Sequence, residues 1–106
     1  MEAALKAIAE PRRRAILRLV RDDERTAGEI AQAFEVTRPA VSQHLRVLKE
    51  AGLVTERRDG TRRFYRLRPE GMRELLRFLE EFWTDALGRL KAAAEREEQE
   101  KRRGAS

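Results

Sequence analysis

The segment from Thr26 to Gly52 constrains the fold of this chain most strongly, because its pattern predicts two helices joined by a tight turn. Thr26 and Glu29 have the spacing of a capping box, in which each side chain bonds a free backbone N–H of the other residue. Apolar residues then recur at helical spacing as far as Phe34. The break in this pattern at residues 35–37 is expected to end the first helix.

The second helix of this pair has one apolar face and one polar face. Thr37 can cap its N-terminus, and Pro39 is tolerated in its first turn because the N–H groups there have no intrahelical acceptor. The apolar stripe consists of Val41, Leu45 and Leu48. The residues outside this stripe are Arg38, Ser42, Gln43, Arg46 and Lys49. Such a helix can pack on its partner while it offers donors and acceptors to DNA base edges.

The charge of the chain is unevenly distributed. The 106 residues have a formal net charge of +5 and a sequence pI of about 10.4. Residues 36–68 carry nine basic and three acidic side chains, a net charge of +6, whereas residues 1–35 are neutral overall and residues 69–100 carry −4. The basic excess therefore lies on the second helix and the segment after it, which favours an anionic partner at that surface.

A β-hairpin is predicted directly after Gly52. Residues 53–58 and 61–67 have strand-like patterns on either side of Asp59-Gly60, a strong hairpin signal. Tyr65 and Leu67 share one face and can cover the domain core. Six arginines lie between positions 57 and 68. They could simply keep an edge strand soluble, but a charged edge usually mixes signs, so we favour a basic contact surface.

Further helices are predicted before and after this central part. Residues 2–9 form a short helical segment, and a second helix runs from Pro11 to about Arg21, followed by a polar link. Pro69 opens the last helix, which is expected to end near Glu98. We expect one domain over residues 1–100 and a disordered tail at residues 101–106.

The last helix predicts a dimer, because its apolar face is wider than one small domain can cover. Two stripes lie side by side, Leu75, Leu79, Phe82, Ala86 and Leu90 in one and Leu76, Trp83 and Leu87 in the other. The residues assigned to the interface between two copies are Leu5, Ile8, Leu79, Phe82, Trp83, Leu87 and Leu90. Two alternatives remain open: the stripe folds back on its own core, or Phe78, Phe82 and Trp83 line a small-molecule pocket.

Several classes of protein are disfavoured by residues that the chain lacks. It has no cysteine and one histidine, His44, and it has no Gly-rich phosphate loop and no paired nucleophile and base, so an enzyme is not expected. No apolar run is long enough to span a membrane, and no signal-peptide pattern is present. A soluble cytoplasmic protein without a cofactor is the expectation.

Three stretches resemble the ArsR/SmtB family of bacterial transcriptional repressors. They are LKAIAEPRRRAILRLV, GEIAQAFEVTRPAVSQHLRVLKEAGLV and RRDGTRRFYRL. The resemblance covers about residues 4–80 and implies a mainly α winged helix-turn-helix with a small β-hairpin wing, in the order α-α-α-α-β-β-α. It also implies a homodimer, joined through its terminal helices, that binds double-stranded DNA at a palindromic operator.

The resemblance assigns the DNA contacts residue by residue. The recognition-helix positions are Thr37, Arg38, Pro39, Ser42, Gln43 and Arg46. The wing positions are Arg57, Arg58, Arg62 and Arg63. Glu35 stands in the turn where many helix-turn-helix units have Gly.

The chain departs from the family in its metal ligands. Metal sensors of the family carry a Cys-X-Cys type motif before the recognition helix, or His and carboxylate ligands on the last helix, and neither set is present here. We therefore expect no metal, and an unknown small-molecule inducer remains open. The alternatives to a specific repressor are a protein–protein adaptor and a non-specific DNA-architectural protein.

Overall fold

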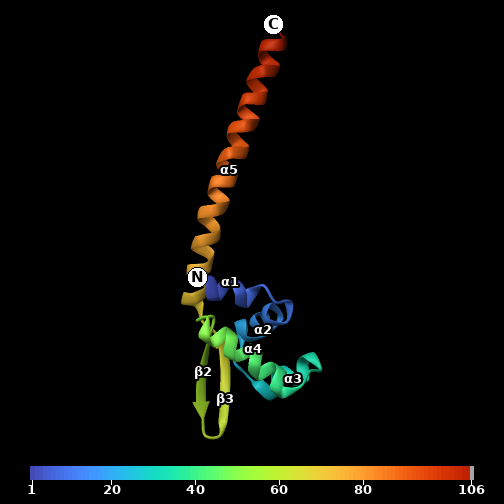
Figure 1. Ribbon diagram of the computed structural model, residues 1–106, viewed down its shortest axis with the longest axis vertical. Helices are drawn as coiled ribbons and strands as arrows, with labels where there is room; N and C mark the ends of the chain where they lie inside the picture. The colour runs from blue at the N-terminus through green and yellow to red at the C-terminus, as the bar shows by residue number, and fades with distance from the viewer. Residues whose placement is uncertain (106) are drawn as a thin grey trace. The chain divides into compact units, whose positions relative to one another are not determined.

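The computed structural model describes residues 1–105, which fall into two compact units, Met1–Leu75 and the part from Leu76 onward. The first unit holds α1 (Glu2–Ile8), α2 (Pro11–Asp22), β1 (Arg25–Thr26), α3 (Ala27–Phe34), α4 (Arg38–Glu50), β2 (Val54–Asp59), β3 (Arg62–Leu67) and the start of α5 (Pro69–Ala105) (Figure 1). The rest of α5 forms the second unit. No helix in residues 1–105 is both long and apolar enough to cross a membrane.

The core of the first unit is entirely apolar. Its fully buried side chains are Ile16, Val20, Ile30, Val41, Leu45, Leu48 and Leu53. The predicted stripe of α4 is thus confirmed as its buried face. In α2 the buried residues are Ile16, Leu17 and Val20, and Leu19 is only partly buried.

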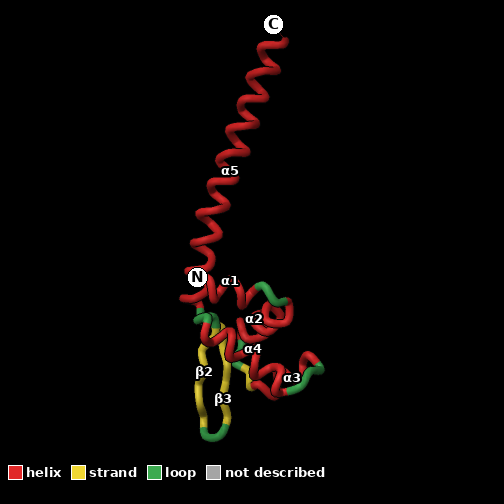
Figure 2. The backbone as a smooth tube through the Cα atoms, in the orientation of Figure 1, coloured by secondary structure: helices red, strands yellow, loops and turns green. Residues whose placement is uncertain are grey.

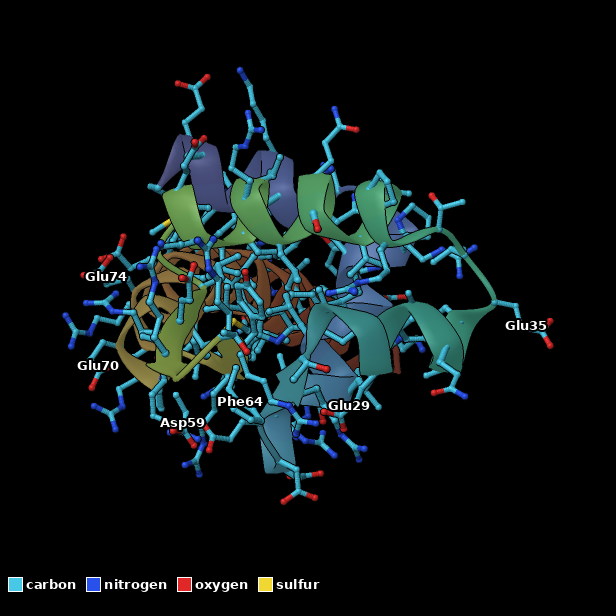
Figure 3. All side chains as sticks on the ribbon, turned by 90° about the horizontal axis from the view of Figure 1, so that it is seen from below. Glu29, Glu35, Asp59, Phe64, Glu70 and Glu74 are labelled. Atoms are coloured by element: carbon cyan, nitrogen blue, oxygen red, sulfur yellow. The ribbon has the colours of Figure 1, made fainter. Side chains whose placement is uncertain are left out.

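The capping box at the start of α3 and the turn between α3 and α4 are both confirmed. The Thr26 hydroxyl accepts a hydrogen bond from the Glu29 N–H at 3.2 Å, and Glu29 accepts one from the Thr26 N–H at 3.3 Å. Glu35 adopts the left-handed conformation, with φ 55° and ψ 42°. Its side chain points outward at the turn (Figure 3). Glu35 therefore adopts the left-handed conformation that Gly usually adopts at such a turn. This conformation is strained for Glu35 because its Cβ lies close to the following carbonyl oxygen.

Both ends of α4 are closed by local hydrogen bonds. The Thr37 hydroxyl accepts a bond from the Ala40 N–H at 3.3 Å. At the other end Gly52 has φ 75°, its N–H donates to Lys49, and the Leu53 N–H donates to Leu48, each at 3.0 Å. These two bonds form a Schellman motif. They end α4, so that the chain continues into the hairpin and Leu53 is buried in the core.

The sheet has three strands rather than the two that the sequence predicts. Its order is β1-β3-β2 and all pairs are antiparallel. Figure 2 shows β2 and β3 side by side and joined by the hairpin loop. β1 lies in the segment predicted as a polar link, and a strand of two residues is too short to show an alternating pattern. The hairpin turn is also shifted by one residue: Asp59 pairs with Arg62, so Gly60 and Thr61 form the loop, and only Gly60 has a positive φ. This matches a type II′ turn, which needs Gly at its first central position.

Helix α5 begins in contact with the end of α4. A Cβ on Gly71 would overlap the Gly52 carbonyl oxygen, so any other residue at this position requires the backbone to shift. The helix continues to Ala105, past its predicted end near Glu98 and through residues 101–105, which are helical where the sequence predicts a disordered tail. An ion pair of 3.1 Å between Glu98 and Arg102, four residues apart, supports this last stretch. Ser106 lies outside the described residues.

Candidate nucleic-acid interface

The outer face of α4 presents its polar side chains to solvent. The six positions assigned to the recognition helix, Thr37, Arg38, Pro39, Ser42, Gln43 and Arg46, are all exposed. The opposite face is buried in the core, so this helix is held from behind and its polar side is left free. The exposed groups include a guanidinium, an amide and a hydroxyl, the kinds of side chain that pair with base edges in the major groove.

A concavity of about 760 Å³ joins α4 to the wing. Arg38 and Ser42 line it from α4, and Arg62 and Arg63 line it from β3. Its remaining lining comes from Thr26, Ala27, Gly28, Glu29, Thr61 and Tyr65. Arg38 lies over Gly28, since a Cβ there would be 3.7 Å from the Arg38 Nε atom. Helix and wing residues predicted separately thus border one basic groove. The predicted residues outside its lining are Thr37, Pro39, Gln43, Arg46, Arg57 and Arg58.

The wing arginines fall on two faces of the hairpin. Arg58 lies opposite Arg63, and Arg57 lies opposite Phe64 in the neighbouring register position, so Arg57 points to the other face. There it makes two hydrogen bonds to Glu24, at 2.7 and 3.0 Å, and its guanidinium lies 4.8 Å from the centre of the Phe64 ring. The bond to Glu24 raises the pKa of Arg57 and lowers that of Glu24. Arg57 therefore serves first to hold the wing to the segment before β1.

The three arginines in the first turn of α2, Arg12, Arg13 and Arg14, are also engaged within the chain. The Arg13 Nε atom donates to the Ala7 carbonyl at 2.7 Å, and Arg14 donates to the Ile8 carbonyl at 2.7 Å. Arg12 lies 5.6 Å from the centre of the Phe34 ring. These bonds satisfy carbonyls at the C-terminal end of α1. This stretch holds α1 in place, so it adds little to a phosphate-binding surface.

The single histidine, on α4, has a half-buried side chain that is 25% exposed. The His44 Nδ1 atom lies 3.8 Å from a carboxylate oxygen of Glu10, which caps α2. Burial raises the pKa of Glu10, but hydrogen bonds from the Arg12 and Arg13 N–H groups and the nearby charges of His44 and Arg13 lower it overall. Within residues 1–105, no three His, Cys, Asp or Glu side chains gather as a candidate metal site.

Sequence reasoning misses two carboxylates that organise the wing. Glu24 reaches Arg57 across 33 residues of chain, so no local pattern predicts the contact. Glu56 bonds Lys49 of α4 at 3.1 Å and lies near Arg58 and Arg63. Glu56 precedes Arg58 by two residues, and this strand spacing is the one local signal that could have indicated their contact.

The residues assigned to a dimer interface divide into two groups. Leu5 and Ile8 pack partly buried against the core of the first unit. In the second unit the large apolar side chains of α5 are exposed, and Phe82, Trp83 and Leu90 are each 64–67% exposed. The other exposed members are Leu76, Phe78, Leu79 and Leu87. An apolar surface of this extent is typical of a protein contact.

Comparison with known proteins identifies the family. Residues 10–56, from the cap of α2 to the start of the wing, match the model described as "Bacterial regulatory protein, arsR family". The chain is 48% identical to the HTH-type transcriptional regulator Rv2034 of Mycobacterium tuberculosis, over 81% of this chain and 80% of that protein. It is 34% identical to the transcriptional repressor SdpR of Bacillus subtilis, over 77% of this chain and 91% of that protein.

A solved structure supports the same assignment. The homodimeric winged helix-turn-helix DNA-binding domain of Mb0332 from Mycobacterium bovis superposes with a TM-score of 0.65. The two are 34% identical over 79% of this chain and 78% of that one. The arrangement of helices and hairpin in this chain is thus a known architecture. The chain belongs to the arsR family of bacterial regulatory proteins and has the winged helix-turn-helix fold.

Proposed function

We propose that the protein is a homodimeric, sequence-specific DNA-binding repressor, in which α4 enters the major groove and the wing contacts the adjacent backbone. The groove shared by α4 and β3 is the observation that carries this proposal. It lies between Arg38 and Ser42 on one side and Arg62 and Arg63 on the other. One duplex can therefore meet base-reading and phosphate-binding side chains together.

The dimer follows from the exposed apolar face of α5. Pairing Leu79, Phe82, Trp83, Leu87 and Leu90 with the same residues of a second copy would remove that face from water. We assign Leu5 and Ile8 to the same interface. Two copies would place their recognition helices about 34–36 Å apart, one turn of DNA, on an inverted repeat.

The relatives SdpR and SmtB support repression as the outcome of binding, whereas the relative HlyU of Vibrio cholerae is described as a transcriptional activator. SdpR is described as a transcriptional repressor, and a dimer seated on a promoter can exclude polymerase without any catalytic activity. We therefore propose a cytoplasmic protein that acts by occupancy and needs no bound cofactor. Regulation by a small molecule would act on the dimer, since the exposed large apolar side chains of residues 1–105, apart from Met1, all lie on α5.

The test begins with selection of bound duplexes from a random library. Binding of the recovered duplex and of a scrambled duplex of equal composition is then followed by fluorescence anisotropy. Arg38→Ala is expected to reduce the preference for the selected duplex by about 1–3 kcal/mol, because it removes a base contact. Gln43→Ala should act in the same way if its amide reads adenine.

Arg62→Ala serves as the contrasting variant in this experiment. It should weaken binding to both duplexes alike and reduce the slope of log affinity against log salt by about one. Equal affinity of the unmodified protein for the selected and scrambled duplexes would reject the proposal of a specific repressor. A preference unaffected by Arg38→Ala would instead reject the assignment of base reading to that residue.

A further inference from the structure

Glu56 lies at the base of the wing, between the recognition helix and two wing arginines. Its side chain is only 11% exposed. One carboxylate oxygen accepts a hydrogen bond from the Lys49 Nζ atom at 3.1 Å. The other oxygen lies 3.6 Å from the Arg63 Nε atom and 3.7 Å from the Arg58 Nε atom. One carboxylate thus meets three cations, which come from α4, β2 and β3.

The carboxylate answers an electrostatic problem in the hairpin. Arg58 and Arg63 are paired directly across β2 and β3, and like charges at such positions destabilise a strand pair. Glu56 lies two residues before Arg58 on the same face and places a negative charge between them. The bond from Lys49 lowers the pKa of Glu56; burial opposes this, and the charges of Lys49, Arg63 and Arg58 add to the lowering. The group is therefore ionised at neutral pH.

The link to Lys49 gives this carboxylate a second role. Lys49 lies in the last turn of α4, whereas Arg58 and Arg63 lie on the wing. A single side chain therefore connects the two parts of the surface that must meet one duplex in a fixed register. Phosphate contacts set that register, and base contacts depend on it.

We propose that Glu56 is a positioning residue that fixes the spacing between the recognition helix and the wing, and so contributes to sequence discrimination without touching DNA. This inference rests on the proposed DNA-binding function. It assigns a specificity role to an acidic residue inside a basic surface. Charge alone would make Glu56 unfavourable there, because it repels phosphate.

The experiment compares Glu56→Gln and Lys49→Gln, which break the same link from its two ends. Glu56→Gln removes a negative charge and should raise affinity for the scrambled duplex, whereas Lys49→Gln removes a positive charge and should lower it. Both should reduce the ratio of selected to scrambled affinity by about twofold to fivefold, the upper part of the range that ion pairs of this kind allow. In the double variant, the ratio of selected to scrambled affinity should be no lower than in whichever single variant has the lower ratio.

Glu50→Gln is the matched control. Glu50 is an exposed carboxylate next to Lys49, with no hydrogen bond or ion pair to the rest of residues 1–105. This variant makes the same change in net charge as Glu56→Gln and should leave the affinity ratio unchanged. Circular dichroism melts establish that each variant is folded, and Lys49→Gln tests the link even if Glu56→Gln does not fold.

The outcomes separate this inference from the proposed function. If the unmodified protein shows no preference between the duplexes, the proposed function fails. If the unmodified protein shows a preference and Lys49→Gln or a folded Glu56→Gln retains it, the positioning role is overturned. The positioning role is also overturned if Glu50→Gln lowers the ratio of selected to scrambled affinity as much as Glu56→Gln does. It is overturned as well if the decrease in the double variant equals the product of the decreases in the two single variants. Either result indicates a general effect of charge.

Discussion

Helices α4 and α5 both carry an apolar stripe, but only one of the two stripes is buried within the chain. In α4, Val41, Leu45 and Leu48 are at most 1% exposed. In α5, Leu75 is 3% exposed, yet Trp83 and Leu90 are 64% and 67% exposed. The difference shows that the first unit completes its own core, while the rest of α5 keeps a surface that a second copy can cover.

The same contrast separates the two kinds of evidence for function. The outer face of α4 is polar and is oriented by a core behind it, so its groups are available to a polar ligand. The face of α5 is apolar, so its most favourable ligand is another apolar surface. The outer face of α4 is therefore suited to contact with DNA, and the apolar face of α5 is suited to contact with a second copy of the chain.

The largest effect should come from the buried stripe. Leu48→Ala leaves a cavity beside Leu45 and Leu53 and should lower the free energy of unfolding by about 2–5 kcal/mol. Denaturant unfolding at fixed protein concentration measures this change. Gln43→Ala, on the exposed side of the same helix, is the control and should change stability by no more than about 0.5 kcal/mol. Similar losses in both variants would contradict the assignment of the two faces.

The exposed stripe should respond through association rather than folding. Trp83→Ala truncates an interface aromatic in both copies and should weaken the dimer by about 2 kcal/mol or more. Analytical ultracentrifugation across a concentration series measures the shift towards monomer. Arg89→Ala, on the same helix but outside the apolar stripes, is the control and should leave the dissociation constant nearly unchanged. A stable monomer of the unmodified protein at micromolar concentration would remove the basis for a dimer.

A smaller effect is expected where α4 meets α5. In Gly71→Ala the new Cβ would contact the Gly52 carbonyl, so the first turn of α5 must shift, at a cost of about 1–3 kcal/mol. Thermal unfolding measures this loss. Gly88→Ala is the matched control, because a Cβ there meets nothing within 4 Å and should stabilise the helix by about 1 kcal/mol. Equal changes at the two glycines would mean that α4 and α5 do not approach as described.

The smallest effect should come from Glu24, the half-buried carboxylate that pairs with Arg57 of the wing. The hydrogen bond from Arg57 holds the pKa of Glu24 below its ordinary value of 4.5. A group with a lowered pKa in the folded state stabilises the fold above its unfolded pKa, and this stabilisation is lost as pH falls through the folded pKa. Between about pH 6 and pH 3, the free energy of unfolding should therefore decline less steeply with falling pH in Glu24→Gln than in the unmodified protein. An unchanged slope would show that the Arg57 pair does not contribute to stability.

The parts of the fold that the sequence predicts are those that depend on residues close to one another in the sequence. The caps at Thr26 and Thr37, the stripe of α4 and the stop at Gly52 each depend on residues within one or two turns, and all are confirmed. Strand β1 depends on pairing with β3, about 40 residues later, and two residues carry no period to recognise. Long-range pairing is decided by tertiary packing, which a local pattern does not contain.

The candidate interface shows the same limit. Polar exposure of the recognition-helix positions follows from the period of α4, so these residues could be named in advance. The sequence could not separate Arg57 from the other wing arginines, because its partner Glu24 lies 33 residues away. It also gave no reason to see Glu56 as part of a DNA-facing surface. Both contacts arise only when the hairpin folds back beside α4 and β1.

Binding to a spaced operator tests most directly the claim that α5 joins two helix–wing surfaces. The selected inverted repeat is compared with the same repeat carrying five extra base pairs at its centre, which turns one half-site by about half a helical turn. The anisotropy titration is predicted to show two chains bound to the original duplex. The affinity for the spaced duplex should be lower by a factor of about one hundred or more. Equal affinity for the two duplexes, or saturation at one chain per duplex, would contradict the account.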